Sequence, residues 1–219
     1  MTSITRLLFV LFSLLLPVNQ LSALTLTADE TVRESTQEVL DRLHADQDTL
    51  KSNPEYIQVI VRELVVPHFD FTTMSRLVLD KYWHTISESE QICFIHGFKN
   101  LLVRRYADIF FGYDDKIIAY QPPEYTGKEG IVTVKQTISR PGEEPYFVEY
   151  PLRPDEYGWK VIDLIVEDIS LLKSYRGTFQ NKIHKQGIHT FIRSFQECDD
   201  HKIKYDSQST VIDTDLILL

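Results

Sequence analysis

The chain has 219 residues, of which 43% are hydrophobic and 25% are charged. These fractions are typical of a globular domain and exclude a disordered or low-complexity chain. The formal net charge is −9. This charge argues against a dominant nucleic-acid function, because binding to a phosphate backbone depends on a basic surface.

Residues 1–23 have the pattern of a secretory signal peptide. Arg6 precedes an apolar run over residues 7–16, and Leu21-Ser22-Ala23 offers a small residue at the cleavage point. A run this short cannot span a bilayer but has the right length for the apolar part of a signal peptide. An uncleaved anchor is the disfavoured alternative. We therefore expect an exported, soluble protein whose mature chain begins near Leu24.

The chain contains two cysteines, Cys93 and Cys198. In an oxidising compartment they could pair, and closing so long a loop would stabilise the fold by about 4 kcal/mol. The alternative is that both are small buried side chains that never meet. The sequence leaves both interpretations open.

Apolar spacing and capping residues divide the chain into helices, a sheet and further helices. Asp70 and Ser170 are each predicted to cap a helix, and Ser87 with Glu90 forms a capping box that opens a long helix. Short turns between the strands favour an antiparallel meander. We predict one α+β domain over residues 24–198, with a tail over residues 199–219. In chain order we expect helices over 28–45, 54–66, 70–81 and 87–111, strands over 115–121, 129–140, 145–153 and 158–166, and helices over 170–185 and 188–198.

Common catalytic motifs are absent from the sequence: it has no GxGxxG, Walker loop, HExxH, CxxC or GxSxG. Cys93 and His96 are one helical turn apart, but no second pair completes a metal site. Asp163 falls on the apolar face of the last predicted strand, where a carboxylate needs a partner. A salt bridge, with Arg176 as its candidate partner, is one interpretation. A catalytic base is the other.

Apart from these features, the sequence is rich in apolar and aromatic residues. Such residues can form either a filled core or the walls of an empty pocket. A curved antiparallel sheet on helices can enclose such a pocket, and an apolar pocket would suit a lipid. Two acyl chains carry about 30 methylenes, whose transfer from water is worth roughly 20–25 kcal/mol. A soluble lipid carrier must therefore provide a comparably dry and deep cavity.

Two stretches resemble the MlaC family, also called the toluene-tolerance (Tgt2/MlaC) family, of exported phospholipid-binding proteins. The first begins at Val65-Val66-Pro67-His68-Phe69-Asp70-Phe71. The second is the W-x-V-x-D-x-x-x-E-x-x-S run over 159–170, followed by Y-R-x-x-F over 175–179. The resemblance covers about residues 28–197. The family usually has glycine where this chain has Asp168.

The resemblance implies an NTF2-like cone whose four-stranded sheet and helices enclose an apolar cavity. It implies a periplasmic phospholipid carrier, acting as a monomer, that is not an enzyme and needs no cofactor or metal. Its partners would be an outer-membrane MlaA-type lipoprotein complex and an inner-membrane MlaD-type ABC transporter complex, which together maintain outer-membrane lipid asymmetry.

Apolar positions within the matching segments are the candidate lipid contacts, with ordinary core packing as the alternative for each. From the helices these are Phe69, Leu77, Trp83, Phe98, Leu102, Tyr106 and Phe110. From the sheet and the closing segment they are Val132, Val134, Ile138, Val148, Tyr150, Val161, Ile165, Ile169, Leu172 and Phe179. Arg176 could meet a lipid phosphate or pair with a carboxylate. Arg104 and Arg105 could form a docking face or a solvated helix surface.

Two other functions remain open at this point. One is an NTF2-like enzyme that uses Asp163 as a general base, which would need a raised pKa. The other is an exported adaptor whose core is simply filled.

Overall fold

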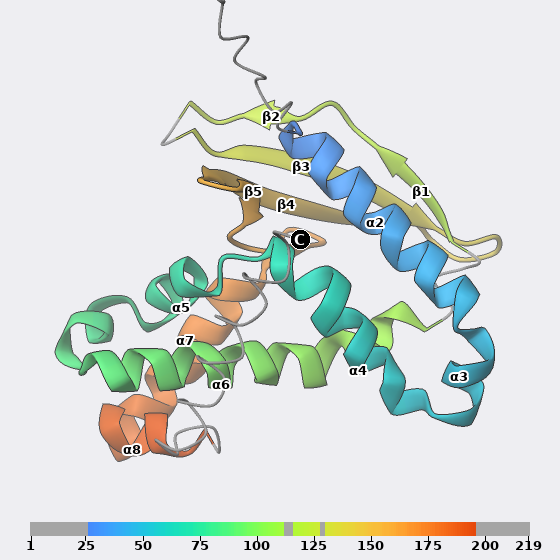
Figure 1. Cartoon of the computed structure of the whole chain (residues 1–219). Helices are drawn as coiled ribbons and strands as arrows, with labels where there is room; N and C mark the ends of the chain where they lie inside the picture. The colour runs from blue at the N-terminus through green and yellow to red at the C-terminus, as the bar shows by residue number, and fades with distance from the viewer. Residues whose placement is uncertain (1–25, 112–115, 128–129, 196–219) are drawn as a thin grey trace, which may run out of the picture.

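The computed structural model describes residues 26–111, 116–127 and 130–195 (Figure 1). The predicted signal peptide (1–23), the tail (199–219) and Cys198 lie outside these residues. Within the described ranges, no helix is both long and apolar enough to cross a membrane.

The helices begin and end close to where capping residues predict. They are α2 (Ala28–Ala45), α3 (Gln47–Ser52), α4 (Ile57–Ile60), α5 (Phe71–Leu79), α6 (Glu88–Tyr106), α7 (Leu171–Gln186) and α8 (Ile188–Arg193). Short 3-10 turns cover Pro54–Tyr56, Val66–His68, Asp80–Thr85 and Ala107–Phe110, and a π-helical turn covers Val61–Val65. The predicted helix over 54–66 is therefore broken into turns of different pitch.

The predicted helix caps are confirmed. The carboxylate of Asp70 accepts the amide of Thr73 at 2.8 Å, and Ser87 exchanges both capping-box hydrogen bonds with Glu90. Ser170 Oγ accepts the amide of Lys173 at 3.1 Å and opens α7. Each cap satisfies a backbone donor that has no partner inside its own helix.

The sheet is antiparallel, as predicted, but it has seven strands and not four. They are β1 (Ile117–Tyr120), β2 (Glu124–Tyr125), β3 (Val132–Ser139), β4 (Tyr146–Asp155), β5 (Gly158–Val161), β6 (Ile165–Val166) and β7 (Ile169–Ser170). The strand order is β1-β3-β4-β6-β7, with β2 pairing to β3 and β5 pairing to β4.

The predicted strand over 158–166 is two strands because the chain leaves the sheet between them. Asp163 accepts the amides of Leu164 at 2.8 Å and Leu172 at 3.1 Å, and the hydroxyl of Ser170 at 2.5 Å. These bonds hold residues 162–164 away from regular strand pairing. A tight turn, with φ of 49° at Glu167 and 63° at Asp168, then joins β6 to β7.

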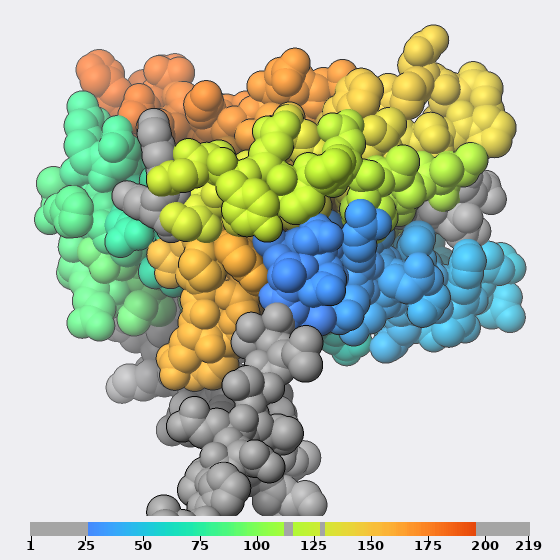
Figure 2. All heavy atoms as spheres, turned by 90° about the horizontal axis from the view of Figure 1, so that it is seen from above, coloured from blue at the N-terminus to red at the C-terminus, as the bar shows by residue number. Residues whose placement is uncertain are grey.

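The molecule has two layers, with the sheet on one side and α5, α6, α7 and α8 on the other (Figure 1). Helix α2 lies along the sheet. Seen from above, its blue surface lies directly beside the yellow-green strands β1 and β2 (Figure 2). One buried cluster lies among α5, α6, α7 and α8. A second joins α2, α3, α4 and α6 to the sheet, and a third lies between α2 and the sheet.

Candidate functional site: an apolar cavity between the sheet and the helices

A cavity of about 920 Å³ lies between the two layers. Its walls come from α2, from residues 61–71, from the second half of α6 with the turn after it, from β3 to β7, and from the start of α7. The volume is at the upper end of the range for ligand pockets, which is roughly 300–1,000 Å³. The cavity is therefore large enough to hold a sizeable apolar ligand.

Strand alternation builds the floor of this cavity. Gln136 and Ile138 on β3 and Val148 and Tyr150 on β4 all face it. The register pairs Gln136 with Val148, directly across the two strands. Because side chains two residues apart share a face, the sheet presents a continuous and mostly apolar surface to the cavity.

One buried amide crosses from this floor to α2. Gln136 is only 1% exposed. Its Nε2 donates to Thr36 Oγ1 at 3.1 Å, and its Oε1 accepts the hydroxyl of Tyr150 at 2.8 Å. Burial raises the pKa of Tyr150, so this hydroxyl stays protonated and keeps donating. The network joins helix and sheet while satisfying polar groups inside an apolar wall.

The cavity opens where the turn after α6 meets the hairpin of β6 and β7. Ile109, Phe111, Val166 and Ile169 all line it and are all exposed, Ile169 at 65%. Lys116 Nζ donates to the hydroxyl of Tyr146 at 2.9 Å beside this opening. The opening is therefore rimmed by exposed apolar side chains, with the charged residues Asp108, Lys116 and Glu167 among them.

A histidine lies in the wall formed by residues 61–71. Burial, together with the nearby charge of Lys160, lowers the pKa of His68. Both effects favour the neutral form of this imidazole.

Nine of the predicted lipid contacts line the cavity. They are Phe69, Leu102, Tyr106, Phe110, Ile138, Val148, Tyr150, Val161 and Ile169. They come from six separate segments of the chain. The fold therefore gathers them into one wall, and their contact with lipid remains a prediction.

The other eight predicted contacts do not line the cavity. They are Leu77, Trp83, Phe98, Val132, Val134, Ile165, Leu172 and Phe179. Trp83, Phe98, Leu172 and Phe179 belong to the core between the helices, where the rings of Phe98 and Phe179 are 5.8 Å apart.

The sheet residues and Leu77 are kept from the cavity by three different causes. Val132 and Val134 are covered by Ala28 and Val32 of α2. Ile165 precedes Val166, which lines the cavity, and alternation turns Ile165 to the other face. Leu77 is 37% exposed on α5.

Sequence reasoning missed the part of the wall that comes from α2 and from the turns over 61–66. Val32 and Val39 lie on the predicted apolar stripe of α2, and they face the cavity together with Thr36. Their spacing indicated a buried helix face. Nothing in that spacing indicated that the face borders an empty space rather than other side chains.

The predicted pairing of Asp163 with Arg176 is wrong. The guanidinium of Arg176 donates instead to the carbonyl oxygen of Leu77, from Nε at 2.9 Å. Asp163 is already satisfied by two amides and the hydroxyl of Ser170. It is not among the described residues that line the cavity. These contacts give Asp163 a structural role at the junction of β5, β6 and α7.

Two other sequence features have a definite place. Arg104 and Arg105 are exposed near the end of α6 and line neither the cavity nor the groove described below.

Cys93 is buried and disulfide-bonded. Its candidate partner Cys198 lies outside the described residues, so that pairing remains a prediction. Among the residues described, no three His, Cys, Asp or Glu side chains group as metal ligands.

Comparison with known proteins identifies the family. The sequence model of the family described as "MlaC protein" matches residues 33–210. The chain belongs to the MlaC family. Within it, the chain is 22% identical over 178 residues to the intermembrane phospholipid transport system binding protein MlaC of Haemophilus influenzae, covering 80% of this chain and 83% of that one. It is 26% identical over 163 residues to the toluene tolerance protein ttg2D of Pseudomonas putida, covering 74% and 75%.

A solved structure also matches. It is the phospholipid-binding protein of Ralstonia solanacearum, determined in complex with a phospholipid. The TM-score is 0.70 and the sequence identity 26%, and the match covers 79% of this chain and 97% of that protein. The mixed arrangement of helices and antiparallel sheet is thus shared with a protein that holds a phospholipid.

Proposed function

We propose that this MlaC-family chain binds phospholipid in the cavity between its sheet and helices and carries it between membranes. The observation that carries the proposal is the cavity itself, which has about 920 Å³ of space, apolar walls and an apolar opening. Burying acyl methylenes there recovers about 0.8 kcal/mol for each one removed from water. The similar Ralstonia protein with its bound phospholipid supports the same use of the fold.

The proposal extends to where the protein works. Residues 1–23 direct export and are removed, and residues 24–198 act in the periplasm as an NTF2-like cone, followed by the tail 199–219. The carrier moves lipid between an outer-membrane MlaA-type complex and an inner-membrane MlaD-type transporter. The name of the Haemophilus relative, which describes an intermembrane transport system, supports this assignment.

The carrier is proposed to act as a monomer, without catalysis and without a cofactor. Lipid transfer requires a change of environment for the acyl chains and no bond cleavage. The engagement of Asp163 with Ser170 and two amides weakens the case for the enzyme alternative, since that carboxylate is not positioned on the cavity.

Native mass spectrometry of the full chain, expressed for export and purified without detergent, tests the proposal. The expected result is a mass excess that corresponds to phospholipid, that is lost on denaturation, and that is identified after organic extraction. A bare polypeptide mass, together with failure to take up lipid from vesicles, would overturn it. The same spectrum reports whether residues 1–23 have been removed.

A matched pair of variants locates the lipid. Val148→Trp places a large ring into the cavity from its floor, while Val59→Trp adds the same ring at a position that is 40% exposed and outside the wall. The first variant should lose most of its bound lipid, and the second should keep it. Equal lipid content in two folded variants would mean that the lipid is not held in this cavity.

A further inference from the structure

A second concavity, a groove of about 610 Å³, adjoins the apolar cavity. Val66, Phe69 and Phe71 line both spaces, so they form a shared wall. The charged residues of the groove are Arg76, Lys99, Arg153, Lys160, Asp70 and Asp155. Four cations and two carboxylates leave a local charge of +2, in a chain whose net charge is −9. The groove therefore differs in sign from the molecule as a whole.

The fold places two of these cations side by side. Arg153 on β4 and Lys160 on β5 are directly opposite in the antiparallel register. Side chains opposite one another start about 5 Å apart at Cβ, and like charges in this arrangement are destabilising. Such a pair is maintained most easily where an anion lies close to both cations.

Two of these cations contact acceptors among the residues that the structure describes. Arg153 Nε lies 2.9 Å from a carboxylate oxygen of Asp70, whose other oxygen caps α5. Lys160 Nζ donates to the carbonyl oxygen of Pro67 at 2.7 Å, which is an uncharged acceptor. The link between residue 70 and β5, where the amide of Asp70 donates to the carbonyl of Val161 at 2.9 Å, fixes these groups relative to one another. The residues that line the groove thus carry a formal charge of +2, and Arg153 and Lys160 are held in place within it.

We propose that this groove binds a phosphate group. Arginine and lysine side chains donate charge-assisted hydrogen bonds to phosphate oxygens, and Arg76, Lys99 and Lys160 approach the groove from α5, α6 and β5. The inference rests on the proposed lipid-carrying function for one source of phosphate, namely the headgroup of a lipid that this chain carries. Free phosphate is the other source. Arg176, considered for this role from the sequence, is instead bound to the carbonyl of Leu77.

The test compares two soluble lipids that differ only in the phosphate, dioctanoyl phosphatidic acid and dioctanoylglycerol, on the delipidated full chain. Calorimetry should show a preference of about tenfold for the phosphate-bearing lipid. Arg76→Gln with Lys99→Gln should remove this preference, leaving the two dissociation constants within about twofold. The matched control, Arg104→Gln with Arg105→Gln, removes two exposed cations near the end of α6, outside the groove, and should keep the preference.

A second measurement, with inorganic phosphate as the ligand, distinguishes a lipid headgroup from free phosphate. If it binds the unaltered chain but not the Arg76→Gln, Lys99→Gln variant, while the two lipids bind alike, the groove takes free phosphate. If neither the binding of inorganic phosphate nor the preference for the phosphate-bearing lipid depends on Arg76 and Lys99, the proposal is overturned, while lipid binding by the chain still stands. If neither lipid binds at all, the carrier function fails independently of the groove. Because Arg76 is exposed, the single variant Arg76→Gln replaces the double variant should the latter not fold.

Discussion

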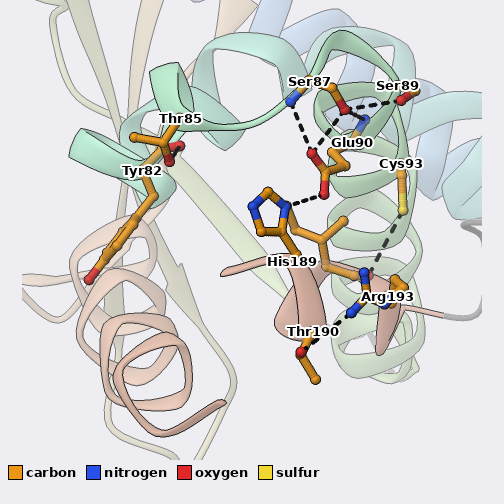
Figure 3. A network of polar contacts seen from close by, with 10 residues as sticks. Tyr82, Thr85, Ser87, Ser89, Glu90, Cys93, His189, Thr190 and Arg193 are labelled. Atoms are coloured by element: carbon orange, nitrogen blue, oxygen red, sulfur yellow. Dashed lines mark hydrogen bonds and ion pairs between the residues drawn. The ribbon is translucent and has the colours of Figure 1, made fainter. Parts of the chain in front are cut away.

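The carboxylate of Glu90 joins two helices that are distant in sequence, because its Oε1 lies 2.6 Å from Nδ1 of His189 (Figure 3). The other oxygen of Glu90 accepts the amide of Ser87 at 3.0 Å and so completes the capping box of α6. One side chain therefore both starts α6 and anchors α8. The ring centroids of Phe191 on α8 and Phe94 on α6 are 6.2 Å apart, so this anchor also positions the aromatic core.

We predict that Glu90→Gln lowers the free energy of unfolding by about 1 kcal/mol at pH 7, because the His189 contact is partly exposed and the cap is weakened. The hydrogen bond from His189, followed by that from the Ser87 amide, lowers the pKa of Glu90 to about 2 from its ordinary 4.5. A carboxyl with a lowered pKa stabilises the fold above its unfolded pKa. This stabilisation is lost as the pH falls from 4.5 towards 2.

Urea unfolding of both proteins between pH 7 and pH 2.5 measures this effect. The difference between them should be present above pH 4.5 and should shrink as the pH falls from 4.5 towards 2.5. Glu88→Gln is the matched control, since it removes a carboxylate from the same first turn without touching the capping box. An equal loss for the two variants would show that only the helix dipole is involved.

Substitutions in the turn between β6 and β7 should change the stability of the fold only through the backbone conformation that each residue prefers. Asp168 is exposed and has a φ of 63°, in the left-handed region that disfavours side chains branched at Cβ. Asp168→Gly should leave the stability unchanged or raise it by up to about 1 kcal/mol, and Asp168→Val should lower it by more than about 1 kcal/mol. Thermal unfolding compares them. Equal melting temperatures for the Gly and Val variants would mean that this turn rearranges freely.

Two helical glycines should respond in opposite directions to alanine. A Cβ on Gly97 of α6 would lie 2.5 Å from the ring of Phe195, whereas a Cβ on Gly177 of α7 meets nothing within 4 Å. Gly177→Ala should therefore stabilise by about 1 kcal/mol through helix propensity. Gly97→Ala should destabilise by about 1–3 kcal/mol, because the tightly packed ring must move. Chemical denaturation measures both, and a stabilised Gly97→Ala would show that Phe195 is loosely held.

Core and cavity residues should separate stability from lipid content. Phe179 is buried, with ring centroids of Phe191 at 5.0 Å and Phe98 at 5.8 Å, and Phe179→Ala should cost about 3–5 kcal/mol. Its folded fraction should still carry lipid. Ile109→Ala, at the exposed rim, should change stability by less than about 0.5 kcal/mol but lower the lipid content. Denaturation and lipid extraction on the same samples check both, and the reverse pattern would contradict the placement of the cavity.

The buried amide in the cavity wall should be costly to remove singly. Gln136→Leu leaves the hydroxyl of Tyr150 without its acceptor, while the hydroxyl of Thr36 still donates to the carbonyl of Val32, and we expect a loss of about 1–3 kcal/mol. Adding Tyr150→Phe removes the orphaned hydroxyl and should recover part of the loss. Denaturant unfolding of both single variants and the double variant measures the coupling between them. Strictly additive losses would mean that the two side chains do not depend on each other.

Local sequence predicted the ends of the helices well because their determinants lie within three residues. Asp70, Ser87 and Ser170 each cap a helix through an amide three positions further along the chain. The alternation of β3 and β4 likewise predicted which residues share a face of the sheet.

The predictions failed where distant segments meet. The extended pattern over 158–166 did not reveal that Asp163 would bind the amide of Leu172 and the hydroxyl of Ser170, which lie in later elements. The same contacts made Arg176 unnecessary as a partner for that carboxylate. Hydrogen bonds between separate elements leave no periodic signal in the sequence.

The sequence by itself determined which side chains leave water, while only the tertiary structure decided what replaces the water. Val134 and Ile138 follow the same alternation on β3, and both are almost fully buried. Ala28 and Val32 of α2 cover Val134, whereas Ile138 borders the cavity. The hydrophobic effect rewards removal from water without direction. Whether the neighbour is a packed side chain or an open cavity therefore depends on how far α2, α6 and the sheet approach one another.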